Sequence, residues 1–347
     1  MAAMQRSRQT FETARVHLDD FADVVVEEWV LPGPVPLALT RRFRPGGATR
    51  SPVLLVHGFA QNRFTWHTSH RSWASGMARD GFDVWNLELR GHGRSRPEGQ
   101  LGAEAFSDYV DDVCAVARAL PGPAFMVGHS LGGATIYGAA TELFGSARAP
   151  LGVVGIGAVY SFGQGNPLLK AAGVVTHTLT ERIPALSRVQ IRSRGIGRAI
   201  GRIYGLADVI GYTAPISGWW PGSVEPELLE ERLEEGFDWT SVRVWQEMAR
   251  WAATGEFDYD AAWRATDVPL LVILGDKDHL LPPEDGRVAY DHSGSGDKSM
   301  VLMSDWEHEV HWGHLDLVLG RLAPDHVWPC VDEWMRARCP MSASHPS

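Results

Sequence analysis

Short apolar runs alternate repeatedly with helical patterns along this sequence. Pro52–Val56 and Leu270–Leu274 have the length and apolar content of buried strands, whereas Leu131–Leu143 follows a helical pattern. Such alternation predicts an α/β protein with a mostly parallel sheet flanked by helices. Further strands are expected at Ala22–Glu28, Leu37–Phe43, Phe82–Leu87, Ala124–Val127, Leu151–Tyr160 and Ser299–Met303, and further helices at Ala103–Leu120 and Pro324–Arg336.

The stretch from Gly163 to Trp263 interrupts this alternation. It holds helical patches and many prolines and glycines, with no convincing strand, and the chain then returns directly to a buried strand after Val268. We therefore favour a helical cap inserted between late core strands over a second, independent domain. The predicted organisation is an N-terminal extension at 1–20, a core at 21–162 and 264–338, the cap at 163–263 and a C-terminal tail at 339–347.

Charge and cysteine content exclude several classes of protein. The 32 basic and 42 acidic side chains give a net charge of −10, which argues against a nucleic-acid partner. The sequence has no apolar run near the ~18 residues of a transmembrane segment, and residues 1–20 lack the apolar region of a signal peptide. The three cysteines are too few and too scattered for a disulfide framework, so we expect a cytoplasmic protein.

A nucleophile is predicted where Gly128–Gly132 follows the strand Ala124–Val127. This segment, Gly-His-Ser-Leu-Gly, fits the G-x-S-x-G pattern, and a helix follows it. In that context the pattern is typical of a nucleophile elbow, a strained turn that presents the serine hydroxyl at the carboxyl edge of the sheet. Its glycines are expected because larger side chains would collide with neighbouring backbone. We therefore predict Ser130 as the nucleophile.

The serine needs a base, and chain order points to a carboxylate and a histidine further on. Gly275–Asp278 follows a predicted strand, and either Asp276 or Asp278 could orient an imidazole. We favour Asp278, because Asp276 lies nearer the strand end, where it could bond backbone amides of the loop. Among the histidines near the end of the chain we choose His314 as the base.

His308, His311 and His314 also invite a metal interpretation, because they are spaced three residues apart. A zinc helix of the H-E-x-x-H type needs its second histidine one residue later, so the spacing fits poorly. Gly313 also interrupts a helix. We predict no metal site and no cofactor, and expect His311 to be a surface residue or a partner of the acid–base pair.

An oxyanion hole requires backbone N–H groups aimed at the developing negative charge. Leu131, directly after the nucleophile, supplies one. The second is expected from the loop after Pro52–Val56, which reads His57-Gly58-Phe59, and Phe59 is the candidate. His57 is expected to be a structural hydrogen-bonding residue.

These segments together resemble the α/β-hydrolase superfamily. The order His57-Gly58-Phe59, Arg90–Ser95, Gly128–Gly133, Gly275–Asp278 and Gly313–Asp316 is similar to that of its serine hydrolases. The resemblance implies an α/β-hydrolase fold, with Ser130, Asp278 and His314 as the triad and Phe59 and Leu131 as oxyanion donors. The ending Gly313–Gly320 also looks like acid lipases and the polyhydroxyalkanoate synthase group. Those synthases carry cysteine at the elbow, so Ser130 favours hydrolysis over polymer synthesis.

Two groups of side chains in the cap bear on the substrate. Trp219 and Trp220 could line an acyl pocket, although large aromatic residues usually serve packing. Six arginines fall within 21 residues with no acidic residue among them, and they could bind an anionic lipid, a CoA phosphate or a carrier protein, or simply be solvated. These arginines are Arg182, Arg188, Arg192, Arg194, Arg198 and Arg202.

Three functions remain open on the sequence alone. We favour a serine hydrolase that cleaves carboxylic esters with hydrophobic acyl groups, acting on a small or lipid-like ester. A thioesterase or acyltransferase would use the same triad with another donor or acceptor. A catalytically silent binding protein would not need Ser130, Asp278 and His314 together.

Overall fold

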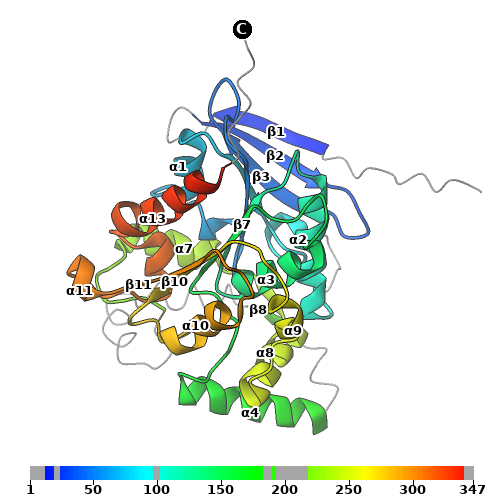
Figure 1. Cartoon of the computed structure of the whole chain (residues 1–347), viewed down its shortest axis with the longest axis vertical. Coiled ribbons are helices and arrows are strands. Elements are labelled where there is room, and N and C mark those ends of the chain that lie inside the picture. The colour runs from blue at the N-terminus through cyan, green and yellow to red at the C-terminus, as the bar shows by residue number, and fades with distance from the viewer. Residues whose placement is uncertain (1–11, 19–23, 97–101, 183–189, 193–217, 340–347) are drawn as a thin grey trace, which may run out of the picture.

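A nine-stranded sheet forms the centre of the computed structural model, which describes residues 12–18, 24–96, 102–182, 190–192 and 218–339 (Figure 1). The strand order is β1-β2-β3-β5-β4-β6-β7-β10-β11. The pairs from β1 to β5 are antiparallel, and every later pair is parallel. The strands are β1 Glu12–Leu18, β2 Val25–Leu31, β3 Leu37–Phe43, β4 Pro52–Val56, β5 Asp83–Leu87, β6 Phe125–His129, β7 Gly152–Ile156, β10 Leu270–Gly275 and β11 Lys298–Met303.

Helices cover both faces of this sheet, as its central strands require. The strands β4 to β7 and β10 are buried almost throughout, because parallel strands bury side chains on both faces. Helices α2 and α3 pack on one face, and α1 and α13 on the other (Figure 1). The core helices are α1 Trp73–Arg79, α2 Phe106–Ala119, α3 Leu131–Leu143, α10 Pro283–His292, α11 Asp305–His308, α12 Asp316–Leu319 and α13 Ala323–Arg338, with short 3-10 turns at Arg63–Thr65 and Gly93–Ser95.

The predicted α/β-hydrolase fold is confirmed, with most elements within a few residues of their expected positions. Pro52–Val56, Leu37–Phe43 and Leu131–Leu143 have the predicted bounds. One strand was missed: β1 lies within residues 1–20, which we expected to be an extension, and it pairs with β2. Its alternating polar sequence lacks the apolar run by which the other strands were recognised.

The insertion predicted to be a cap lies between β7 and β10. It contains helices α4 Pro167–Arg182, α7 Pro226–Glu235, α8 Val242–Thr254 and α9 Asp260–Trp263. The expectation of no strand is wrong, because β8 Gln190–Arg192 pairs with β9 Trp239–Ser241 in a short antiparallel ladder. Three-residue strands carry too little pattern to be recognised in a sequence.

Helices α4 and α8 lie together at the end of the molecule far from β1 (Figure 1). Their close approach depends on Gly173, where a Cβ would lie 2.8 Å from Ala252 Cβ. Most of the arginine-rich segment, including Arg188, Arg194, Arg198 and Arg202, lies outside the described residues.

Candidate active site

Ser130 stands at the sharp turn between β6 and α3. Its φ of 58° is unusual for a residue with a side chain, and such strain is typical of a nucleophile elbow. The glycines around it allow the turn, as predicted: a Cβ on Gly128 would lie 2.4 Å from the Gly132 oxygen, and one on Gly132 would lie 2.4 Å from the Val56 oxygen. The turn therefore tolerates only glycine at these two positions.

The structure brings His314 and Asp278 into contact beside this turn. His314 Nδ1 donates to Asp278 Oδ2 at 2.6 Å, and both side chains are buried. The second oxygen, Asp278 Oδ1, accepts from the Leu281 backbone N–H at 2.7 Å. Because Nδ1 carries the proton, Nε2 of the neutral ring is left as the acceptor.

Asp276, the alternative carboxylate, has a different set of partners. Its Oδ1 accepts from the Trp312 backbone N–H at 2.9 Å, and its Oδ2 accepts from His311 Nδ1. Asp305 Oδ1 lies 3.6 Å from the same nitrogen of His311. Asp276 thus bonds the loop that leads to His314, which is the role we expected for it.

The two predicted oxyanion donors come from different elements: Leu131 is the first residue of α3, and Phe59 lies on the loop after β4. A Cβ on Gly58 would lie 2.8 Å from Ser130 Cβ, so the loop that carries Phe59 touches Ser130. Within the described residues, neither the Phe59 nor the Leu131 backbone N–H has a hydrogen-bond partner. Both donors are therefore available to a bound ligand.

His57 fixes this loop from behind. Its Nδ1 donates to the Gly58 oxygen at 2.9 Å, and its Nε2 accepts from the Leu89 backbone N–H at 3.1 Å. Complete burial holds the pKa of His57 well below its usual range, so the ring is neutral. This is the structural role predicted for it.

Ser130 and His314 line one apolar cavity of about 280 Å³. Core residues such as Phe59 and cap residues such as Trp219 and Trp245 share its walls. Trp220, which was predicted to share this pocket with Trp219, lines a separate pocket instead. Its ring centroid lies 4.4 Å from that of His311, in an edge-to-face contact. Two other cap tryptophans, Trp251 and Trp263, are buried by packing.

The sequence model of the Alpha/beta hydrolase family matches residues 53–337. The chain belongs to the α/β-hydrolase family. It is 26% identical over 276 residues to a monoacylglycerol lipase of Mycolicibacterium smegmatis, covering 77% of this chain and 84% of that protein.

Solved structures agree with this assignment of the fold. A monoglyceride lipase from Saccharomyces cerevisiae superposes with a TM-score of 0.61 at 16% identity, covering 96% of this chain and 99% of that one. A thermophilic esterase from Thermogutta terrifontis gives a TM-score of 0.58 at 19% identity, covering 94% and 99%. The predicted resemblance to the lipase and esterase branch is confirmed, and these relatives support the predicted class, a carboxylic ester hydrolase.

Two residues that position the site of this α/β hydrolase were not recognised in the sequence. His129 Nε2 donates to the His314 backbone oxygen at 3.0 Å, and burial keeps the pKa of His129 well below its usual range. Asp316 Oδ2 accepts from the backbone N–H groups of Gly313 and Trp220 at 2.6 and 2.8 Å. Both lie inside motifs that were used to predict Ser130 and His314, namely Gly128–Gly132 and Gly313–Asp316.

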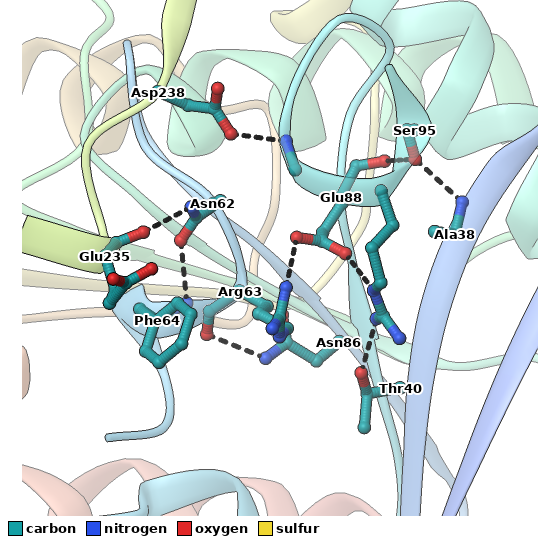
Figure 2. A network of polar contacts seen from close by, with 12 residues as sticks. Ala38, Thr40, Asn62, Arg63, Phe64, Asn86, Glu88, Ser95, Glu235 and Asp238 are labelled. Atoms are coloured by element: carbon teal, nitrogen blue, oxygen red, sulfur yellow. Dashed lines mark hydrogen bonds and ion pairs between the residues drawn. The ribbon is translucent and has the colours of Figure 1, made fainter. Parts of the chain in front are cut away.

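The hydrolase core is also tied to its cap by polar contacts around Asn62 and Asp238 (Figure 2). Asn62 Nδ2 donates to the Glu235 oxygen at 2.7 Å, and the Asp238 backbone N–H donates to the Ala60 oxygen at 2.8 Å. On the core side, the buried Glu88 carboxylate accepts from Arg63 and Arg94 (Figure 2). The loop that carries Phe59 is therefore held between core and cap.

No helix in the described part of the chain has the length and apolar character needed to cross a bilayer.

Proposed function

We propose that the enzyme hydrolyses carboxylic esters with hydrophobic acyl groups through an acyl-enzyme on Ser130. One observation carries the proposal: Ser130 and His314 line the same apolar cavity, while Asp278 bonds the far nitrogen of the His314 ring. The hydroxyl and the basic nitrogen are thus presented to one space, and an acyl chain would find apolar walls there.

The reaction follows from these positions. His314 Nε2 takes the Ser130 proton as Oγ attacks the ester carbonyl, and the negative charge forms on the carbonyl oxygen. The Phe59 and Leu131 N–H groups stabilise that oxygen. His314 then returns the proton to the departing alcohol, and a water activated by the same nitrogen releases the acid. Asp278 holds the ring in the required tautomer throughout.

The size of the cavity bears on the acyl group. A volume of about 280 Å³ is near the lower end for small-molecule sites, which favours short or medium acyl chains. Hydrolysis, rather than transfer to another acceptor, is our expectation because no described feature specifies an acceptor site. A cytoplasmic location stays a prediction from the sequence.

The test combines one variant with one probe. Ser130→Ala should lose turnover of p-nitrophenyl esters while keeping its unfolding temperature, because only the hydroxyl that forms the covalent bond is removed. A fluorophosphonate should label the wild type and leave the variant unlabelled. Equal labelling of the two proteins would remove Ser130 from the mechanism.

Multiple turnovers of a medium-chain ester without added acceptor would support the hydrolase. A single equivalent of acyl group held on Ser130, discharged by an added alcohol or thiol, would instead identify an acyltransferase.

A further inference from the structure

Gln61 contributes a polar side chain to the mostly apolar cavity beside Ser130. Among the described lining residues it is the one amide side chain, and no carboxylate, lysine or arginine accompanies it. Its neighbours there include Leu233 and Phe237 of the cap. A polar group in an apolar cavity costs free energy unless a ligand satisfies it, so its orientation matters.

A buried relay fixes which end of the amide faces the cavity. Arg232 Nη2 donates to Thr65 Oγ1 at 3.3 Å, and Thr65 Oγ1 donates to Gln61 Oε1 at 2.8 Å. The Gly58 backbone N–H donates to the same Oε1 at 3.3 Å. A guanidinium only donates, so Thr65 must accept from Arg232 and pass its own proton to Gln61.

The reverse orientation of the amide would set the Gln61 NH₂ group against the Gly58 N–H, which can only donate. Oε1 therefore faces Gly58 and Thr65, and Nε2 takes part in neither of these hydrogen bonds. Within the described residues Nε2 has no hydrogen-bond partner. Arg232 is fully buried and forms no ion pair with any described carboxylate. Its hydrogen bond to Thr65 links it to the site.

The amide also lies close to the reacting serine. A Cβ placed on Gly58 would be 2.8 Å from Ser130 Cβ and 3.2 Å from Gln61 Cδ, so the two side chains flank the same glycine. A group on Gln61 Nε2 is thus presented to a ligand whose carbonyl is bound at Ser130.

We propose that Gln61 is a specificity-determining residue whose Nε2 donates a hydrogen bond to a second oxygen of the substrate. The inference rests on the proposed function, in which the acyl group is apolar, so this oxygen belongs to the alcohol part of the ester. The carbonyl oxygen already has the two backbone donors of Phe59 and Leu131. The preferred substrates are esters of alcohols that carry a hydroxyl or ether oxygen near the ester bond.

The test uses two hexanoate esters of equal size, 2-methoxyethyl hexanoate and n-butyl hexanoate, which differ in one ether oxygen. We expect the wild type to favour the methoxyethyl ester in kcat/KM by roughly tenfold. Gln61→Met should bring that ratio close to one. Gln61→Glu keeps acceptors for Gly58 and Thr65 but lacks the NH₂ group, so it should also abolish the preference.

Variants of Thr65 test the hydrogen-bond relay, and a variant of Gln246 serves as the control. Thr65→Val should lower the ratio because the amide is no longer held in one orientation, and Thr65→Ser should restore it. Gln246→Glu, in the outer groove lined by Glu104 and Arg243, is the charge-matched control and should keep the wild-type ratio.

Two results would overturn the proposal. One is a wild-type ratio near one. The other is an equal loss of kcat for both esters in Gln61→Met with the ratio unchanged, which would make Gln61 a third oxyanion donor. Fluorophosphonate labelling at Ser130 counts folded active sites in every variant. Loss of labelling in the wild type would refute the proposed function, whereas an unchanged ratio in fully labelled Gln61 variants would refute this inference alone.

Discussion

The elbow and the cap are held in place in different ways. Around Ser130, backbone atoms approach so closely that glycine is required, as at Gly128 and Gly132. The cap is joined to the core by hydrogen bonds between residues distant in the chain, including Asn62 Nδ2 to the Glu235 oxygen and the Trp220 N–H to Asp316 Oδ2. The comparison shows why the elbow is readable as a short motif while the cap contacts are not: one depends on neighbouring residues, and the other joins residues far apart in the chain.

The largest expected effect lies in the core. Asp278→Asn should lower kcat by about 10⁴-fold, because the amide would hold His314 in the wrong tautomer. Asp276→Asn should mainly affect stability, since Asp276 bonds the loop at His311 and Trp312. Steady-state kinetics and thermal unfolding of both variants make the test. An inactive Asp276→Asn beside a near-normal Asp278→Asn would reverse the assignment.

The close packing at the elbow predicts the next effect. Gly132→Ala should cost about 3 kcal/mol of unfolding free energy, because the added methyl would meet the Val56 and His57 oxygens at 2.4 and 2.5 Å. Gly296→Ala, where the methyl would meet nothing within 4 Å, is the control and should stay within about 0.5 kcal/mol. Urea unfolding measures both. Equal stability of the two variants would refute the packing argument.

Asp316, which joins the His314 loop to the cap, should show itself in the pH dependence of stability. Burial raises the pKa of Asp316 to about 7, against about 3.9 in an unfolded chain. Between these values the folded state holds the extra proton, so the contribution of Asp316 to stability falls as the pH rises.

Asp316→Asn removes this titration and should gain about 4 kcal/mol relative to the wild type between pH 4 and pH 8. Urea unfolding at several pH values gives the difference. A difference between the two proteins that stays constant with pH would show that Asp316 is already ionised at pH 4.

The smallest effect is expected in the cap. Replacing Arg188, Arg192 and Arg198 together by glutamine should change hydrolysis of p-nitrophenyl hexanoate by less than about twofold, because an uncharged substrate offers no charge for arginine to attract. Activity on an acyl-CoA, measured in parallel, checks whether these arginines dock a phosphorylated donor. A large loss with the simple ester would place the segment in the site itself.

Most strands of the sheet, the elbow and its glycines could be predicted from the sequence, because these depend on apolar periodicity and on local backbone geometry. The sequence also singled out Asp278 and His314, which lie where strand ends meet at one edge of a parallel sheet; the structure joins them at 2.6 Å. It could not reveal β1 or the β8–β9 ladder, whose short or polar strands carry little pattern.

The folded structure was needed to show that Trp219 and Trp220 line different pockets, since adjacent side chains can face different ways. It alone oriented the Gln61 amide, because that depends on a hydrogen bond from Arg232 to Thr65, two residues 167 positions apart in the chain. Sequence spacing carries no information on such a contact, which exists only once the cap has folded against the core.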